Sequence, residues 1–305
     1  MKERRRTPRA AVRTTAARIT LGAPAKVNLW LRVFGKDQKG FHAIETLFQL
    51  VSVADTVAVE ATAGGIRLEG SPEALGPARE NLAVRAAEAW FREARVAGGA
   101  VITLTKRIPW NAGLGGGSAD AAAVLRGLNL LHGGRLPDGD LIALGAELGA
   151  DVPFFLAATP LALGWGRGER LLALPALPLL IVPPAAPVRT ADAYAWLEKD
   201  RPSERTGEFA AVVPASSLAS WADVRRHSAN DFEPVVAGRL PAIGHWLDRV
   251  RETDAFLVRL AGSGGAIVAL YETAAQRDNA WRKLGADERV LRGDTLTAAP
   301  PPELA

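Results

Sequence analysis

The chain of 305 residues contains no cysteine. This absence excludes disulfides, iron–sulfur clusters, thiolate zinc sites and cysteine nucleophiles. Histidine is scarce as well, and the four that are present form neither an HExxH pattern nor a close pair. They therefore predict no histidine-rich metal site, and we expect no metal ion held by protein side chains alone.

A membrane-spanning run is also missing. Residues 171–188 carry no charge, but the five prolines among them exclude a transmembrane helix. The run LPLLIVPP within this stretch predicts a short buried strand that continues into an extended, linker-like segment. We therefore place a domain boundary here, between residues 18–175 and residues 176–305, and expect a cytoplasmic protein with no membrane partner.

The net charge of +4 is concentrated at the N-terminus. Residues 1–18 hold seven basic residues and one acidic residue, so the rest of the chain is slightly acidic. Such a tail can contact RNA or a membrane surface, or act as a targeting peptide. Because no aromatic residue lies between the arginines, we favour a disordered basic extension over residues 1–17 and expect no specific nucleic-acid partner.

Apolar residues make up 48% of the chain, which is typical of a globular protein. Strand-like and helix-like segments mix without a regular βαβ period, and this favours an α+β fold. The pattern predicts strands over 25–33, 43–51, 56–60 and 101–108, and a strand–turn–strand unit over 256–271. It predicts helices over 81–96, 119–131, 141–148, 191–199 and 240–251.

The strongest chemical signal is Gly113-Leu114-Gly115-Gly116-Gly117-Ser118, between a predicted strand and a predicted helix. Glycines let the backbone approach a ligand closely, and a helix N-terminus directs unpaired N–H groups and a positive dipole end to the same point. This stretch, the Gly loop, therefore predicts a phosphate site, where the Ser118 hydroxyl contacts a phosphate oxygen or its Mg²⁺. The spacing matches no P-loop, GxGxxG or GxSxG motif, and a flexible connection is the alternative.

A second glycine cluster, Gly262-Ser263-Gly264-Gly265, lies between two strand-like runs. A hairpin turn explains it as well as a ligand contact does.

Taken in order, these pieces resemble the GHMP kinase superfamily. The matching stretches are residues 24–29, 40–49, 80–82, 106–118, 149–155, 164–169, 230–233 and 262–265. The resemblance implies a two-domain GHMP kinase fold. Its N-terminal half would be an S5-domain-2-like nucleotide domain, and its C-terminal half a ferredoxin-like α/β sandwich on the substrate side.

The resemblance also implies roles for single residues. Asp151 would be the catalytic carboxylate, and Lys26 its cationic partner. If Lys26 points inward from its apolar strand it needs a carboxylate, and Asp151 is the natural choice. The ATP phosphates would be wrapped by Pro109, Trp110, Asn111, Ala112, Gly113, Leu114, Gly115, Gly116, Gly117, Ser118 and Ala119.

The remaining implied roles concern the two bases and the acceptor. Asn81 and Lys106 would lie beside the adenine. Phe41 and His42 would hold a cytosine, and Tyr194 would stack on its other face. Asn28 would lie near the acceptor hydroxyl.

The implied reaction is ATP-dependent phosphorylation of the 2-hydroxyl of 4-diphosphocytidyl-2-C-methyl-D-erythritol, a step toward isoprenoid precursors. Mg²⁺ would arrive with the nucleotide, and the enzyme would be a monomer or weak homodimer. A homoserine or mevalonate kinase is the nearest alternative, but neither needs an aromatic–histidine pair for a base. A non-catalytic nucleotide sensor is the other alternative, and it would be expected to lose Lys26 or Asp151.

Two positions depart from the usual pattern. Phe41 stands where a tyrosine is common, which keeps an aromatic face and loses a hydroxyl. Trp110-Asn111 replaces smaller residues at the entry of the Gly loop, where an indole is expected to alter the packing of the nucleotide.

Overall fold

The computed structural model describes residues 18–36, 42–70, 77–157, 159–165, 168–171, 177–184, 187–200, 220–297 and 303–304. The predicted basic extension over residues 1–17 and the predicted contact Phe41 lie outside these residues. His42 begins a described strand, but its side chain is not described.

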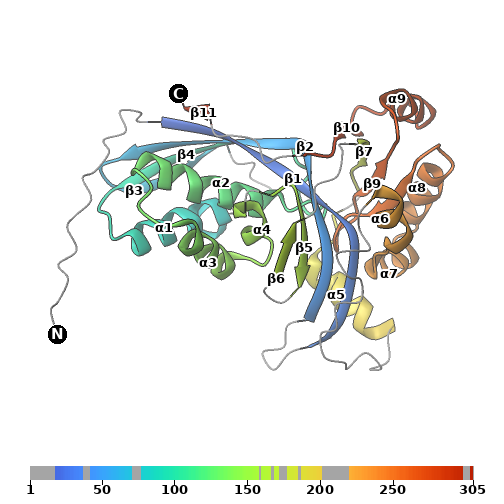
Figure 1. Ribbon diagram of the computed structural model, residues 1–305, viewed down its shortest axis with the longest axis horizontal. Helices are drawn as coiled ribbons and strands as arrows, with labels where there is room; N and C mark the ends of the chain where they lie inside the picture. Colours follow the sequence, from blue (N-terminus) through green and yellow to red (C-terminus); the bar gives the residue numbers. More distant parts are fainter. Residues whose placement is uncertain are drawn as a thin grey trace.

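The first half is built on a sheet with two long antiparallel strands, β1 (Arg18–Lys36) and β2 (His42–Thr62). Figure 1 shows both strands running from the helical half to the centre of the molecule, where they bend. The strands predicted over 43–51 and 56–60 are one strand. Asp55 breaks the apolar pattern between them, yet it is fully buried within β2.

Five shorter strands complete this sheet. β4 (Gly99–Thr105) pairs antiparallel with β2, and β3 (Gly65–Glu69) pairs parallel with β4. The other end of β2 pairs with β5 (Leu161–Trp165), which pairs with β6 (Gly168–Leu171). Near the chain end, β11 (Glu303–Leu304) returns to pair with β1.

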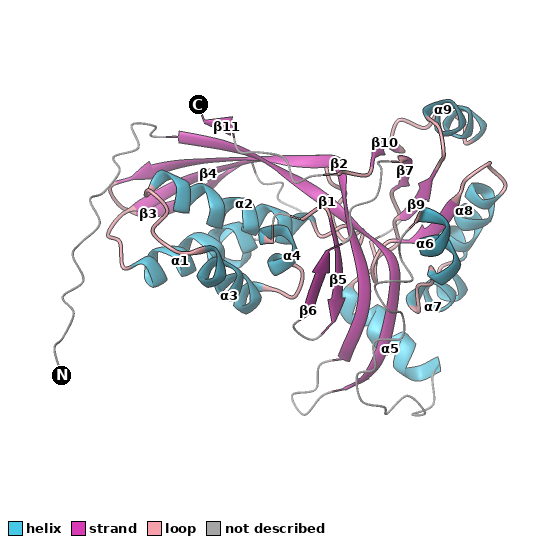
Figure 2. Cartoon of the chain, viewed as in Figure 1, coloured by secondary structure: helices cyan, strands magenta, loops and turns pink. Residues whose placement is uncertain are grey.

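Helices cover one face of this sheet (Figure 2). Asn81 is the N-cap of α1 (Leu82–Ala94), because its side-chain oxygen accepts a hydrogen bond from the N–H of Ala83 at 2.9 Å. The buried core beneath the helices includes Trp90, Leu125 and Leu128. The elements are a 3₁₀ helix η2 (Ala78–Glu80), α1 (Leu82–Ala94), α2 (Gly116–Leu131), α3 (Asp138–Leu148) and α4 (Val152–Leu156).

The second half has a four-stranded antiparallel sheet in the order β10–β7–β9–β8. Apart from the extra helices in its first crossover, the half follows the β-α-β-β-α-β order of a ferredoxin-like sandwich. Its strands are β7 (Pro178–Val182), β8 (Leu257–Leu260), β9 (Ile267–Leu270) and β10 (Leu291–Asp294). Its helices are α5 (Thr190–Asp200), α6 (Trp221–His227), α7 (Phe232–Arg239), α8 (Pro241–Arg251) and α9 (Ala274–Lys283).

The two halves share one buried interface. An apolar cluster that includes Leu29 and Trp30 of β1 packs against Leu179 and Val268 of the second sheet. Because β11 returns to the first sheet, the end of the chain contributes to both halves. The division of the chain at residue 175 stays a prediction.

The packing of α2 against the first sheet yields a test of stability. Leu125 is fully buried in this core, whereas Leu130 on the same helix is 39% exposed. We expect Leu125→Ala to lower the free energy of unfolding by about 2–5 kcal/mol, because it removes buried methyl groups and leaves a cavity. Leu130→Ala should change it by less than about 0.5 kcal/mol. Urea titration of both variants measures the difference, and equal losses would contradict this packing.

Candidate active site

The Gly loop connects the first sheet to α2. The backbone N–H of Lys26 in β1 donates to the carbonyl of Leu114 at 3.0 Å. Gly115 has a φ of +71°, and a Cβ there would lie 2.9 Å from the Phe155 ring and 3.0 Å from Cγ of Lys26. Only glycine therefore fits between the loop and the side chains beneath it. Helix α2 starts at Gly116, so its first N–H groups have no partner within the helix.

The loop lines a cavity of about 560 Å³ at the junction of the two halves. Of the predicted site residues whose side chains are described, every one but Ala119 lines this cavity. Trp110, which is 47% exposed, and Asn111, which has a φ of +51°, stand at the loop entry. The predicted set in the lining is Lys26, Asn28, Asn81, Lys106, Pro109, Trp110, Asn111, Ala112, Gly113, Leu114, Gly115, Gly116, Gly117, Ser118, Asp151 and Tyr194.

Lys26 and Asp151 meet in this cavity although 125 positions separate them in the sequence. The Lys26 ammonium lies 3.4 Å from Oδ2 of Asp151, and it donates to Oδ1 of Asn28 at 2.8 Å. It also lies 5.2 Å from the centre of the Phe48 ring. The side chain of Lys26 is 5% exposed and that of Asp151 is 29% exposed, so the ammonium is buried and the carboxylate faces the cavity.

The backbone of β1 sets the direction of this lysine. The pairing of β1 with β2 shifts register between Pro24 and Lys26 and again between Asn28 and Trp30. Bulges of this kind re-aim side chains next to sites. Asn28 is then fixed in turn, because its Nδ2 donates to the Thr46 hydroxyl at 2.7 Å.

Asp151 precedes α4, a helix that begins with Val152 and Pro153. Val152, Phe154 and Phe155 are buried in the first core, and they anchor the backbone that carries the carboxylate. The apolar residues that follow Asp151 therefore keep the acid at the edge of the core, and Lys26 provides the ionic partner.

A second cluster of charges lies beside the Gly loop, and two of its members, Lys106 and Asp120, line the same cavity. The Lys106 ammonium contacts the carboxylates of Asp55 and Asp120, the latter at 2.6 Å. Asp55 also accepts the backbone N–H groups of Arg107 at 2.5 Å and Ile108 at 2.8 Å. The cluster thereby ties the strand that enters the loop to the helix that leaves it.

Neither Asp55 nor Asp120 is among the residues that the sequence predicts. The signal for Asp120 is a single acid inside the alanine-rich start of α2, where an apolar face is expected. Asp55 likewise interrupts an apolar strand. Both patterns indicate buried acids that need a cation, and Lys106 supplies it for both.

Burial and the shared cation set the ionisation of this cluster. Burial raises the pKa of Asp120 to about 6; Lys106 opposes this rise, and the nearby Asp55 adds to it. Burial opposes the charge on Lys106, but Asp120 and Asp55 outweigh it and raise the pKa of Lys106 above its ordinary value. One oxygen of Asp120, Oδ1, is buried without a hydrogen-bond partner.

The far end of the cavity belongs to the second half. Tyr194 of α5 meets the ring of Phe232 edge to face, with centroids 4.9 Å apart. Burial raises the pKa of Tyr194, and the charge of Asp151 adds to this shift. The second glycine cluster is a hairpin turn between β8 and β9, and two of its residues, Gly262 and Ser263, also line the cavity.

Among the described residues, no group of three or more acidic or histidine side chains is arranged to hold a metal ion. Within the same residues, no helix is long and apolar enough to cross a membrane.

The buried Asp120 predicts a pH dependence of stability. Its pKa in the folded protein, about 6, lies above the value of about 3.9 expected in the unfolded chain. The folded state therefore holds this proton more tightly, and its contribution to stability falls as pH rises from about 4 to about 6. Asp120→Asn removes this contribution, so the free energy of unfolding of the variant should rise relative to wild type across this range. Urea titrations at stepped pH measure the difference, and a constant difference would contradict the assignment.

Comparison with known proteins identifies the family of the chain. The family models "GHMP kinases N terminal domain" and "GHMP kinases C terminal" match residues 81–159 and 215–288. The 4-diphosphocytidyl-2-C-methyl-D-erythritol kinase of Solibacter usitatus is 39% identical over 280 residues, which cover 90% of this chain and 88% of the relative. The enzyme of that name from Chlorobium phaeobacteroides is 39% identical over 267 residues, covering 87% and 93%.

Solved structures of kinases resemble this chain in fold. A crystal structure of 4-(cytidine 5'-diphospho)-2C-methyl-D-erythritol kinase superposes with a TM-score of 0.73 at 35% identity, covering 90% of this chain and 98% of that one. A homoserine kinase from Cytophaga hutchinsonii has a TM-score of 0.68 at 18% identity over 96% and 98% of the two chains, a likeness of fold alone. The predicted α+β, two-domain fold is confirmed. The chain belongs to the GHMP kinase family, among the 4-diphosphocytidyl-2-C-methyl-D-erythritol kinases.

Proposed function

We propose that this protein transfers the γ-phosphoryl group of ATP to the 2-hydroxyl of 4-diphosphocytidyl-2-C-methyl-D-erythritol, yielding ADP and the 2-phosphate. This reaction belongs to the non-mevalonate route to isoprenoid precursors. The observation that carries the proposal is the meeting of the Lys26 ammonium and the Asp151 carboxylate in the cavity that the Gly loop lines. The named relatives support the identity of the substrate.

The residues at the Gly loop fit a nucleoside triphosphate. ATP with its Mg²⁺ supplies the phosphoryl group. Gly115, Gly116, Gly117 and Ser118 line the cavity at the start of α2, so free N–H groups and the positive end of the helix dipole face it. A Cβ at Gly115 would clash with Lys26 and Phe155, so glycine is required at this position of the loop.

Lys26 and Asp151 have different roles in the proposed phosphoryl transfer. Phosphoryl transfer depends mainly on positioning and on compensation of charge. Asp151, which is partly exposed to the cavity, accepts the proton of the acceptor hydroxyl as the new P–O bond forms. Lys26, which donates to Asn28, holds a positive charge beside that carboxylate, and this charge would compensate the charge that develops on the transferred group.

The residues toward the second half are proposed to bind the acceptor. Asn28 presents its amide beside Lys26, and Tyr194 lines the cavity on the α5 side. Phe41, which lies outside the described residues, and His42, the first residue of β2, remain the proposed contacts of the cytosine ring. Asn81 and Lys106, which also line the cavity, remain the proposed neighbours of the adenine.

The wider proposal is a cytoplasmic monomer or weak homodimer that binds no specific nucleic acid. The rest of the chain beyond the basic tail is slightly acidic, which supports the last point.

A competition of acceptors tests the substrate. Purified protein is given ATP and Mg²⁺ with 4-diphosphocytidyl-2-C-methyl-D-erythritol, homoserine or mevalonate, and release of ADP is followed by a coupled assay. We expect turnover with the cytidine-linked polyol alone, because a site that hydrogen-bonds a base rejects acceptors that lack it. Turnover with homoserine or mevalonate would assign the chain to a different kinase activity.

Removal of the carboxylate tests the mechanism. Asp151→Asn keeps the size of the side chain and removes the proton acceptor, so kcat should fall by about 10²–10⁴-fold while the affinity for ATP stays within a few-fold. Asp140→Asn on the exposed side of α3 is the matched control and should leave both constants unchanged. An unaltered kcat for Asp151→Asn would remove Asp151 from the reaction.

A further inference from the structure

Residues 230–233, the segment Asn-Asp-Phe-Glu, have no role in the kinase mechanism proposed above. The segment lies beside β1, the strand that carries Lys26. Leu31 donates its N–H to the carbonyl of Ala229 at 2.7 Å and accepts the N–H of Asp231 at 3.0 Å. The Asp231 carboxylate accepts the N–H of Val33 at 2.8 Å. The segment is thus fixed to β1 on the side away from β2.

The side chain of Asn230 points into the second half and is 5% exposed. Its Nδ2 donates to the carbonyls of Leu260 and Gly262, both at 2.8 Å, and its Oδ1 accepts the N–H of Phe232 at 2.8 Å. Both N–H groups of the amide and its oxygen are therefore engaged. One side chain ties the start of α7 to the β8–β9 turn.

That turn rests directly on the Gly loop. A Cβ at Gly262 would lie 2.8 Å from the carbonyl oxygen of Gly113, and a Cβ at Gly113 would lie 2.0 Å from that of Ala261. The N–H of Ala266 donates to the carbonyl of Ala112 at 3.4 Å. The two backbones touch without side chains between them, so a small displacement of the turn displaces the loop.

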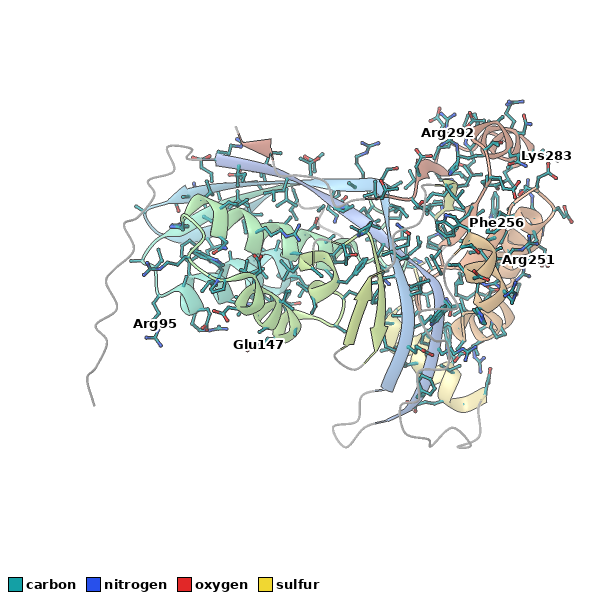
Figure 3. All side chains as sticks on the ribbon, viewed as in Figure 1. Arg95, Glu147, Arg251, Phe256, Lys283 and Arg292 are labelled. Carbon is teal, nitrogen blue, oxygen red and sulfur yellow. The ribbon has the colours of Figure 1, made fainter. Side chains whose placement is uncertain are left out.

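The segment is also braced from outside. Glu233 accepts the N–H of Leu260 at 2.9 Å through one oxygen and the guanidinium of Arg251 at 2.6 Å through the other. Figure 3 labels Arg251 on the outer side of the second half. Asn230 therefore lies between β1, to which the segment is hydrogen-bonded, and α7, which the contacts of Glu233 hold in place.

We propose that Asn230 is a positioning residue for nucleotide binding, which holds the β8–β9 turn against the Gly loop and so keeps the loop in its phosphate-binding form. This inference rests on the proposed function, since it assigns the nucleotide to that loop. Asn230 does not line the cavity; Gly262 and Ser263, which its amide positions, do.

The first test compares two buried asparagines. Asn129 at the far end of α2 is 7% exposed and donates to and accepts from the backbone of Leu136, so Asn129→Ala loses buried hydrogen bonds away from the loop. Asn230→Ala should weaken the binding of ADP by about tenfold, the effect of about one lost buried hydrogen bond. It should raise KM for ATP more than it lowers kcat. Asn129→Ala should leave ADP binding within about twofold of wild type, while thermal denaturation records the stability of both.

A second variant reaches the same contact if Asn230→Ala does not fold. Gly264 lies outside the cavity lining, but a Cβ there would come within 2.3 Å of the Ala112 carbonyl carbon and the Gly113 nitrogen. Gly264→Ala should push the turn from the loop and weaken ADP binding to a similar degree. Gly238→Ala in α7 has open space around it and is the matched control.

Isothermal titration calorimetry measures the affinity of every variant for ADP. Wild-type affinity in Asn230→Ala or in Gly264→Ala, or an equal loss in the controls, would overturn the inference and leave the kinase proposal intact. Absence of ADP binding and of turnover in the wild-type protein would instead refute the proposed function.

Discussion

The Gly loop is held between two backbones, and the rest of the site depends on this constraint. On one side the Lys26 N–H of β1 donates to Leu114, and on the other the β8–β9 turn touches Gly113. The turn approaches Gly113 too closely for a side chain, and a Cβ at Gly115 would press on Phe155 and Lys26, so only glycine fits at these two positions. Glycines give up much conformational freedom on folding, and contact from both sides supplies the order that they do not have alone.

The strand that touches the loop also carries the lysine that faces the carboxylate. One backbone hydrogen bond at Lys26 fixes the loop, and the side chain of the same residue meets Asp151. The position of the loop and the position of the ion pair are therefore not independent. A shift of β1 would move both the Gly loop and the Lys26 ammonium, so the two positions are coupled through this strand.

Buried charge has two different uses in this half of the molecule. Lys106 neutralises Asp55 and Asp120 inside the protein and ties both ends of the Gly loop together. Lys26 is more deeply buried than Lys106, but its carboxylate partner Asp151 faces the cavity. In the first cluster every carboxylate oxygen except Oδ1 of Asp120 has a partner in the protein, and the Asp120 side chain is 4% exposed, whereas the Asp151 side chain of the second is 29% exposed.

Local pattern alone accounts for much of this protein. Glycines next to a helix start predict an anion site, and alternating and helical spacing predict the main strands and helices, because each depends on residues close in sequence. Tertiary structure decides the remainder. The partners of Asp120, the meeting of Lys26 with Asp151, and the contact of the second glycine turn with the first are contacts between distant segments. No local propensity encodes them, since they exist only once the two sheets have packed.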